Sequence, residues 1–133
     1  MNSLCYCTSL RAAARRVTAI YDDALAPVEV NVAQFALLRR LASAGPLSVK
    51  DLAAALELER STVTRNVRVL AKLRLLELGG SEEDRRMAVI RLTDEGRRTL
   101  LRGEPLWESA QRRIESVLGS EDAAGLRATL QAL

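Results

Sequence analysis

Apolar side chains recur every three or four positions over most of this chain, the spacing that gathers them on one face of a helix. The first two such segments cover residues 9–25 and 32–42, and a proline follows each of them, Pro27 and Pro46. Near the carboxyl end the same spacing predicts two more helices, separated by a break at Gly119. Helices are therefore expected at both ends of the chain.

Two short helices joined by a tight turn are predicted in the middle of the chain. The first covers residues 48–55, with Ser48 as its N-cap, and the second covers about residues 61–73. Two helices connected so closely form a helix-turn-helix. The second helix is expected to bury a stripe at positions i, i+4 and i+7, formed by Val63, Val67 and Leu70.

Residues 76–92 change to the two-residue alternation of a β-hairpin around a polar loop. Ala88, Ile90 and Leu92 are expected to face inward on its second strand. Thr93 then offers an N-cap for the long helix that follows. The order of helix, helix-turn-helix, hairpin and long helix predicts an α+β fold, mainly α, with a winged helix-turn-helix.

The composition suits one packed domain. The chain has 133 residues, 48% of them hydrophobic and 28% charged, a balance typical of globular proteins. No segment reaches the roughly 18 uninterrupted apolar residues of a membrane span, and the amino terminus lacks the layout of a signal peptide. We therefore expect a cytoplasmic protein that does not contact membranes and whose two cysteines are reduced thiols.

Positive charge is concentrated on the second helix of the predicted motif. The formal net charge is only +3, but no acidic residue occurs between Arg60 and Arg74. A continuous positive face on the helix after a tight turn is what the DNA phosphate backbone requires. Taken alone, such a face could also be a solvated basic surface, and the flanking hairpin favours the DNA interpretation.

Three segments in this order resemble the MarR family of winged-helix regulators, and the resemblance covers nearly the whole chain. The segments are residues 47–53, 61–65 and 84–96. The resemblance implies a transcription regulator, more often a repressor, that binds a pseudo-palindromic operator in double-stranded DNA as a homodimer. Residues 32–93 would form the DNA-binding region, and residues 1–28 and 95–133 the dimerisation helices.

In this arrangement the second helix of the motif would lie in the major groove, with its amino-terminal residues nearest the base edges. Arg65 could form a bidentate contact with guanine, and Asn66 one with adenine. By resemblance Arg86 reaches the minor groove from the wing tip, while Asp84 and Arg85 could also form an ordinary ion pair. The expected DNA-binding residues are Ser48, Lys50, Arg60, Ser61, Thr62, Thr64, Arg65, Asn66, Arg68, Arg85 and Arg86.

Two positions depart from the family pattern. Arg74 stands where relatives commonly have the glycine that ends the recognition helix, and Leu78 where a basic residue is common. A non-glycine residue is less comfortable in a left-handed helix cap. The end of the recognition helix is therefore expected to differ from that of relatives.

The amino-terminal cysteines suggest a regulatory site. Cys5 and Cys7 stand where the first helix begins in the peroxide-sensing branch of the family, in which oxidation of a cysteine releases DNA. Cys5 aligns best, and Tyr21 could supply a phenol from the same helix. The alternative is that both cysteines only pack at the dimer interface, since free cysteine is commonly buried.

Catalysis and metal binding have little support in the sequence. The chain has no histidine, so zinc could bind only between cysteines of two chains. We find no nucleophile with a base and no phosphate-binding loop, and Asp22 and Asp23 are expected on a solvated helix face. We therefore expect no cofactor, no metal and no enzymatic activity. Three alternatives stay open: a regulator controlled by a phenolic or other aromatic small molecule, a thiol peroxidase, and a winged-helix adaptor that does not bind DNA.

Overall fold

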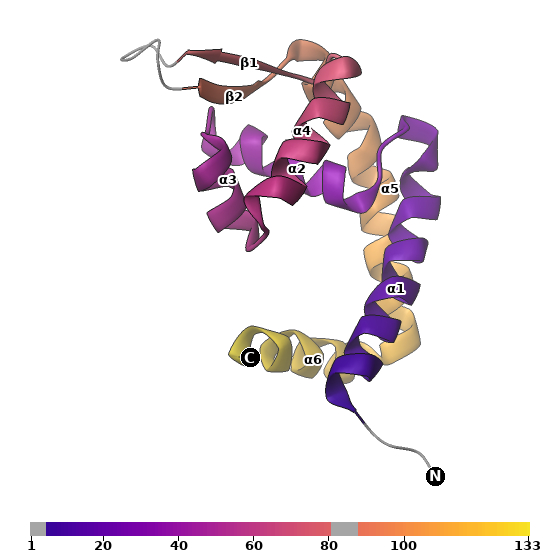
Figure 1. Cartoon of the computed structure of the whole chain (residues 1–133). Helices are drawn as coiled ribbons and strands as arrows, with labels where there is room; N and C mark the ends of the chain where they lie inside the picture. Colours follow the sequence, from indigo (N-terminus) through magenta and orange to yellow (C-terminus); the bar gives the residue numbers. More distant parts are fainter. Residues whose placement is uncertain (1–4, 81–87) are drawn as a thin grey trace.

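The computed structural model describes residues 5–80 and 88–133 (Figure 1). This part of the chain is mainly helical, with one small antiparallel sheet, as the hydrophobic pattern predicted. None of its helices combines the length and the apolar character needed to cross a membrane. The elements are α1 (Tyr6–Leu25), the 3-10 helix η1 (Ala26–Val28), α2 (Val32–Ala44), α3 (Val49–Leu56), α4 (Arg60–Lys72), β1 (Leu76–Gly80), β2 (Ala88–Leu92), α5 (Asp94–Leu118) and α6 (Ser120–Ala132).

The molecule has a compact head and a long helical arm (Figure 1). The head contains α2, α3, α4 and the hairpin, whereas α1 and α5 run side by side along the arm and α6 lies at its far end. Most of the buried apolar side chains belong to one core inside the head, to which Phe35, Leu52, Val63 and Ile90 contribute fully buried side chains. Leu25 of α1 and Leu100 of α5 belong to the same core, so the head and the near end of the arm are packed together.

Two helix starts differ from the sequence prediction. Helix α1 begins at Tyr6 and not at Ser9, so Cys5 is its N-cap and Cys7 lies in its first turn. Helix α4 begins at Arg60 and not at Ser61. Glu57 takes the left-handed conformation and ends α3, and Glu59 two residues later is the N-cap of α4.

The hairpin is confirmed, and Ile90 and Leu92 of its second strand lie in or against the core as predicted, but the prediction that Ala88 faces inward is wrong. Ala88 is exposed, because it pairs with Gly80 at the end of the hairpin that projects from the head (Figure 1). Val89 and Ile90 are both buried, and only Ile90 belongs to the main core. Leu47 forms backbone hydrogen bonds with Ile90 in both directions, so the chain entering α3 extends the sheet.

Arg74 takes the left-handed conformation that glycine usually occupies after a recognition helix, with φ at 62°. The hydroxyl of Thr93 donates a hydrogen bond to the carbonyl oxygen of Arg74 at 2.7 Å and accepts one from the N–H of Gly96 at 3.0 Å. The predicted N-cap of α5 therefore also fixes the end of α4.

Asp22 is not the solvated carboxylate that the sequence suggested. Its Oδ1 accepts a hydrogen bond from the N–H of Val32 at 2.8 Å. The same helix start carries a capping box, in which Asn31 and Gln34 bond to each other's backbone N–H groups. Asp22 thus attaches α1 to the first turn of α2.

Candidate nucleic-acid interface

Helix α4 has one buried face and one charged face. Val63, Val67 and Leu70 are almost completely buried in the head, as predicted. The opposite face is exposed, and its residues recur at i, i+4, i+7 and i+11, which aligns them along the helix. We call this set the α4 row; it consists of Ser61, Arg65, Arg68 and Lys72.

The cations of the α4 row are available to an external anion. None of Arg65, Arg68 and Lys72 forms an ion pair with another residue in the described parts of the chain. A phosphate could therefore contact them without displacing any carboxylate of the described residues, and an α-helix fits into a major groove.

The other predicted residues of α4 flank this row. Arg60 is exposed, whereas Thr62, Thr64 and Asn66 are half-buried at the edges of the exposed face. The predicted α4 residues therefore lie on the exposed face of the helix or at its edges. The three arginines among them are all exposed.

Ser48 and Lys50 have different surroundings at the start of α3. The hydroxyl of Ser48 accepts a hydrogen bond from the N–H of Asp51 at 3.1 Å, which caps the helix as predicted. Lys50 is exposed in the first turn. Arg85 and Arg86, predicted at the wing tip, lie outside the described residues.

Val69 is a residue that sequence reasoning missed. It lies on α4 four positions after Arg65 and outside the buried stripe, and 43% of its surface is exposed. An apolar side chain beside polar recognition residues can contact the methyl group of thymine. The signal in the sequence was an apolar residue out of register with Val63, Val67 and Leu70.

Cys5 and Cys7 are free and exposed at the amino-terminal end of α1. The pKa of the Cys5 thiol lies below its ordinary value, first because of a hydrogen bond with the Thr8 side chain and then because of backbone hydrogen bonds at Thr8 and Cys7. A lowered pKa increases the fraction of reactive thiolate at neutral pH. In the described parts of the chain, no three His, Cys, Asp or Glu side chains are grouped so as to hold a metal ion.

Tyr21 lies far from these cysteines within one chain. It stands sixteen positions after Cys5 along α1, a rise of about 24 Å. Its ring packs near Trp107 instead, with the ring centroids 6.5 Å apart, and burial raises the pKa of its phenol. The structure therefore does not bring the three predicted sensing residues together in one chain.

A cluster around Trp107 joins the head to the arm and was not found from the sequence. The guanidinium of Arg39 on α2 lies 3.9 Å from the centroid of the Trp107 ring on α5. The same guanidinium forms an ion pair with Glu104 at 3.6 Å. The only signal was the presence of a single tryptophan in a chain with few aromatic residues.

Comparison with known families gives one match over the head. A model described as the MarR family matches residues 29–87. A curated relative, the uncharacterized HTH-type transcriptional regulator YhbI of Bacillus subtilis, is 33% identical over 86 residues, which make up 65% of this chain and 56% of that protein. The match thus spans little more than half of the length of that relative.

Solved structures extend the similarity to nearly the whole chain. The M. tuberculosis transcriptional regulator MosR is 30% identical over 98% of each chain, with a TM-score of 0.79, and has also been solved in complex with DNA. The transcriptional repressor CouR, solved bound to a 23-mer DNA duplex, is 28% identical over 93% of this chain and 88% of its own, with a TM-score of 0.84. CouR from Rhodococcus jostii RHA1 has also been solved bound to p-coumaroyl-CoA.

Proposed function

This chain belongs to the MarR family of winged helix-turn-helix transcriptional regulators, and we propose that it is a homodimeric repressor that binds a pseudo-palindromic operator. The observation that carries the proposal is the α4 row, in which Arg65, Arg68 and Lys72 are exposed without an ion-pair partner among the described residues. Its cations would neutralise phosphates while α4 lies in the major groove. In this proposal residues 32–93 read the DNA.

Residues 1–28 and 95–133 would then form the dimer. Large apolar side chains are exposed along the arm, and we infer that a second chain covers them, because extensive exposed apolar surface usually marks an interface. A two-fold dimer would place two α4 helices on successive half-sites, about one helical turn apart. Sedimentation should give twice the mass of one chain, and the mass of one chain would contradict the dimer. The exposed apolar residues of these two segments are Tyr6, Leu10, Val17, Leu101, Val117, Leu126, Leu130 and Leu133.

Two single substitutions on α4 distinguish contacts with base edges from contacts with phosphates. Arg65→Ala should reduce the preference for operator over scrambled duplex by about tenfold to a hundredfold for each half-site, because one bidentate base contact contributes about 1–3 kcal/mol. Lys72→Ala, at the other end of the α4 row, should weaken binding to both duplexes equally and lower the salt slope by about one for each protomer, or about two for the dimer. Fluorescence anisotropy at several salt concentrations measures both effects. An unchanged operator preference in Arg65→Ala would remove this residue from the recognition site.

We further propose that oxidation of Cys5 is a signal that releases the repressor. The support is the exposed position of Cys5 and the hydrogen bonds that lower its thiol pKa. An organic hydroperoxide would transfer one oxygen to the thiolate, giving a sulfenic acid at Cys5 and the corresponding alcohol. Because Cys5 stands at the N-cap position of α1, this change would alter the amino-terminal end of the dimerisation arm.

The role of Thr8 makes the proposal for Cys5 testable through pH. In a Cys7→Ser background, the rate of Cys5 alkylation by iodoacetamide should rise with pH as the thiolate forms. Thr8→Val should move the midpoint to higher pH, because it removes the hydrogen bond that contributes most to lowering the pKa. Hydroperoxide should release operator DNA from Cys7→Ser but not from Cys5→Ser. Release from both variants, or from neither, would contradict a sensing role for Cys5.

A further inference from the structure

A second row of residues runs along α4 beside the α4 row. Its members recur at the same i, i+4, i+7 and i+11 spacing, one position further along the chain, so they share one flank of the exposed face. The N–H of Leu73 donates a hydrogen bond to the carbonyl oxygen of Val69 at 3.2 Å, so the helical spacing holds through the C-cap. We call this set the flank row; it consists of Thr62, Asn66, Val69 and Leu73.

The flank row changes character along its length. Thr62 and Asn66, near the start of α4, are polar and half-buried. Val69 and Leu73 are apolar, and 43% and 44% of their surfaces are exposed. One exposed apolar side chain is common on a protein surface, but these two are neighbours at i and i+4. The carboxyl-terminal half of the flank row therefore presents an apolar patch beside the cations of the α4 row.

Val69 lies between two residues that are predicted to read bases. In an α-helix with 3.6 residues per turn, Val69 projects about 40° around the axis from Arg65 and about 60° from Asn66 in the opposite direction. It follows them by four and three positions, the spacings at which side chains on a helix surface are neighbours. A base pair next to those contacted by Arg65 and Asn66 would therefore meet Val69.

The apolar group that the major groove offers is a methyl group. Thymine carries it at C5, whereas the nitrogen and oxygen atoms at the other base edges are hydrogen-bond donors or acceptors. An apolar side chain against a donor or acceptor leaves that group without a partner, which costs binding free energy. Val69 and Leu73 therefore suit a methyl group better than a polar base edge.

We propose that Val69, with Leu73 beside it, reads the C5-methyl group of one pyrimidine in each half-site of the operator. The inference rests on the proposed DNA-binding function and adds a base preference to it. Thymine is one such pyrimidine, and cytosine methylated at C5 presents the same group at the same edge of the groove. Methylation of a cytosine at this position would therefore raise the affinity of the protein for the DNA.

Uracil in place of thymine tests the proposal, because it removes the methyl group and keeps the base pairing and the phosphate charges. The probe is a duplex that the wild type selects from a random-sequence pool, with thymines replaced by uracil one symmetric pair at a time. At one pair the wild type should lose about fourfold in affinity for each half-site, or about fifteenfold for the dimer, as expected when one methyl group per half-site is no longer buried. Fluorescence anisotropy measures the ratio of the two affinities.

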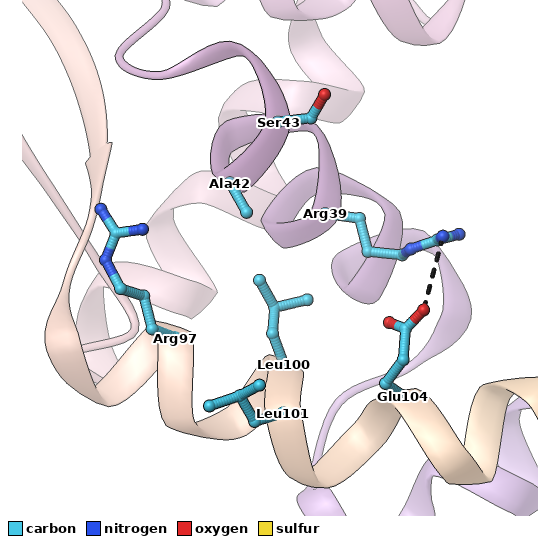
Figure 2. Close-up of a pocket in the computed structure, with 7 residues that line it drawn as sticks. All are labelled: Arg39, Ala42, Ser43, Arg97, Leu100, Leu101 and Glu104. Atoms are coloured by element: carbon cyan, nitrogen blue, oxygen red, sulfur yellow. Dashed lines mark ion pairs between the residues drawn. The ribbon is translucent and has the colours of Figure 1, made fainter.

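The double variant Val69→Ala with Leu73→Ala removes the patch and should bring the thymine-to-uracil ratio at that pair close to one. The matched control is Leu101→Ala with Val117→Ala, which makes the same two changes at exposed positions of α5; Figure 2 shows Leu101 on this helix. The control should keep the ratio of the wild type. A change in stability or in dimerisation acts on both duplexes alike, so it does not alter the ratio.

Cytosine methylation gives a second measurement at the same position. With the pair changed to cytosine, C5-methylation should raise the affinity of the wild type by a similar factor and leave that of the Val69→Ala, Leu73→Ala variant unchanged. Equal affinity of the wild type for thymine and uracil at every position, or an equal loss in this variant, would overturn the methyl contact, while specific binding would still support the repressor function. Failure to select any sequence from the pool would contradict sequence-specific DNA recognition itself, and with it this inference.

Discussion

Replacing Gly96 by alanine should destabilise the fold by about 3 kcal/mol, as expected for overpacking at a rigid contact. A Cβ atom at this position would lie 2.7 Å from Cδ1 of Leu92 and still closer to the carbonyl oxygen of Leu75. That carbonyl cannot withdraw freely, because it accepts a hydrogen bond from the N–H of Thr93. The added methyl group would therefore force α5 away from the base of the hairpin.

Urea unfolding followed by circular dichroism measures the change in the free energy of unfolding. Gly125→Ala is the matched control, because a Cβ there meets nothing within 4 Å and the residue lies inside α6. This control should stabilise the protein by up to about 1 kcal/mol, since alanine is the better helix former. Both variants must be compared at one protein concentration if the protein is a dimer. An unfolding midpoint of Gly96→Ala equal to that of the wild type would show that the contact is not rigid.

The double substitution Arg65→Glu with Arg68→Glu should reduce affinity for any DNA duplex by about a hundredfold or more at low salt. It replaces two exposed cations of the α4 row by anions that would face phosphates. Because both side chains are exposed, the free energy of unfolding should change little. Loss of DNA affinity without loss of stability is the expected combination.

Arg98→Glu with Arg102→Glu is the control for total charge. It changes the formal net charge by the same amount, but the two residues are exposed on α5. DNA affinity of this variant should stay much closer to that of the wild type, apart from long-range screening effects. Equal losses in the two double variants would mean that net charge, and not the α4 row, attracts DNA.

The sequence predicted the parts of the fold that depend on local patterns. The stripe of Val63, Val67 and Leu70 was correct because a helix that packs on a core needs apolar residues at this spacing. Ser48 and Thr93 were correct because an N-cap acts on N–H groups only two or three residues away. The exposed face of α4 followed from the same periodicity.

The parts that the sequence did not predict depend on contacts between distant segments. Asp22 has no local signal for its bond to Val32, which exists only because α1 ends beside the start of α2. Arg39 and Trp107 are far apart in the chain, and the packing of α2 on α5 brings them together.

The most direct test of the proposed function is a salt series of fluorescence anisotropy titrations. The reduced protein is titrated onto a duplex from upstream of its own gene and onto a scrambled duplex of the same length. We expect tighter binding to the upstream duplex, with the logarithm of the association constant falling linearly with the logarithm of salt concentration for both. Binding to neither duplex, or binding that does not depend on salt, would contradict DNA recognition through α4 and would favour a winged-helix adaptor.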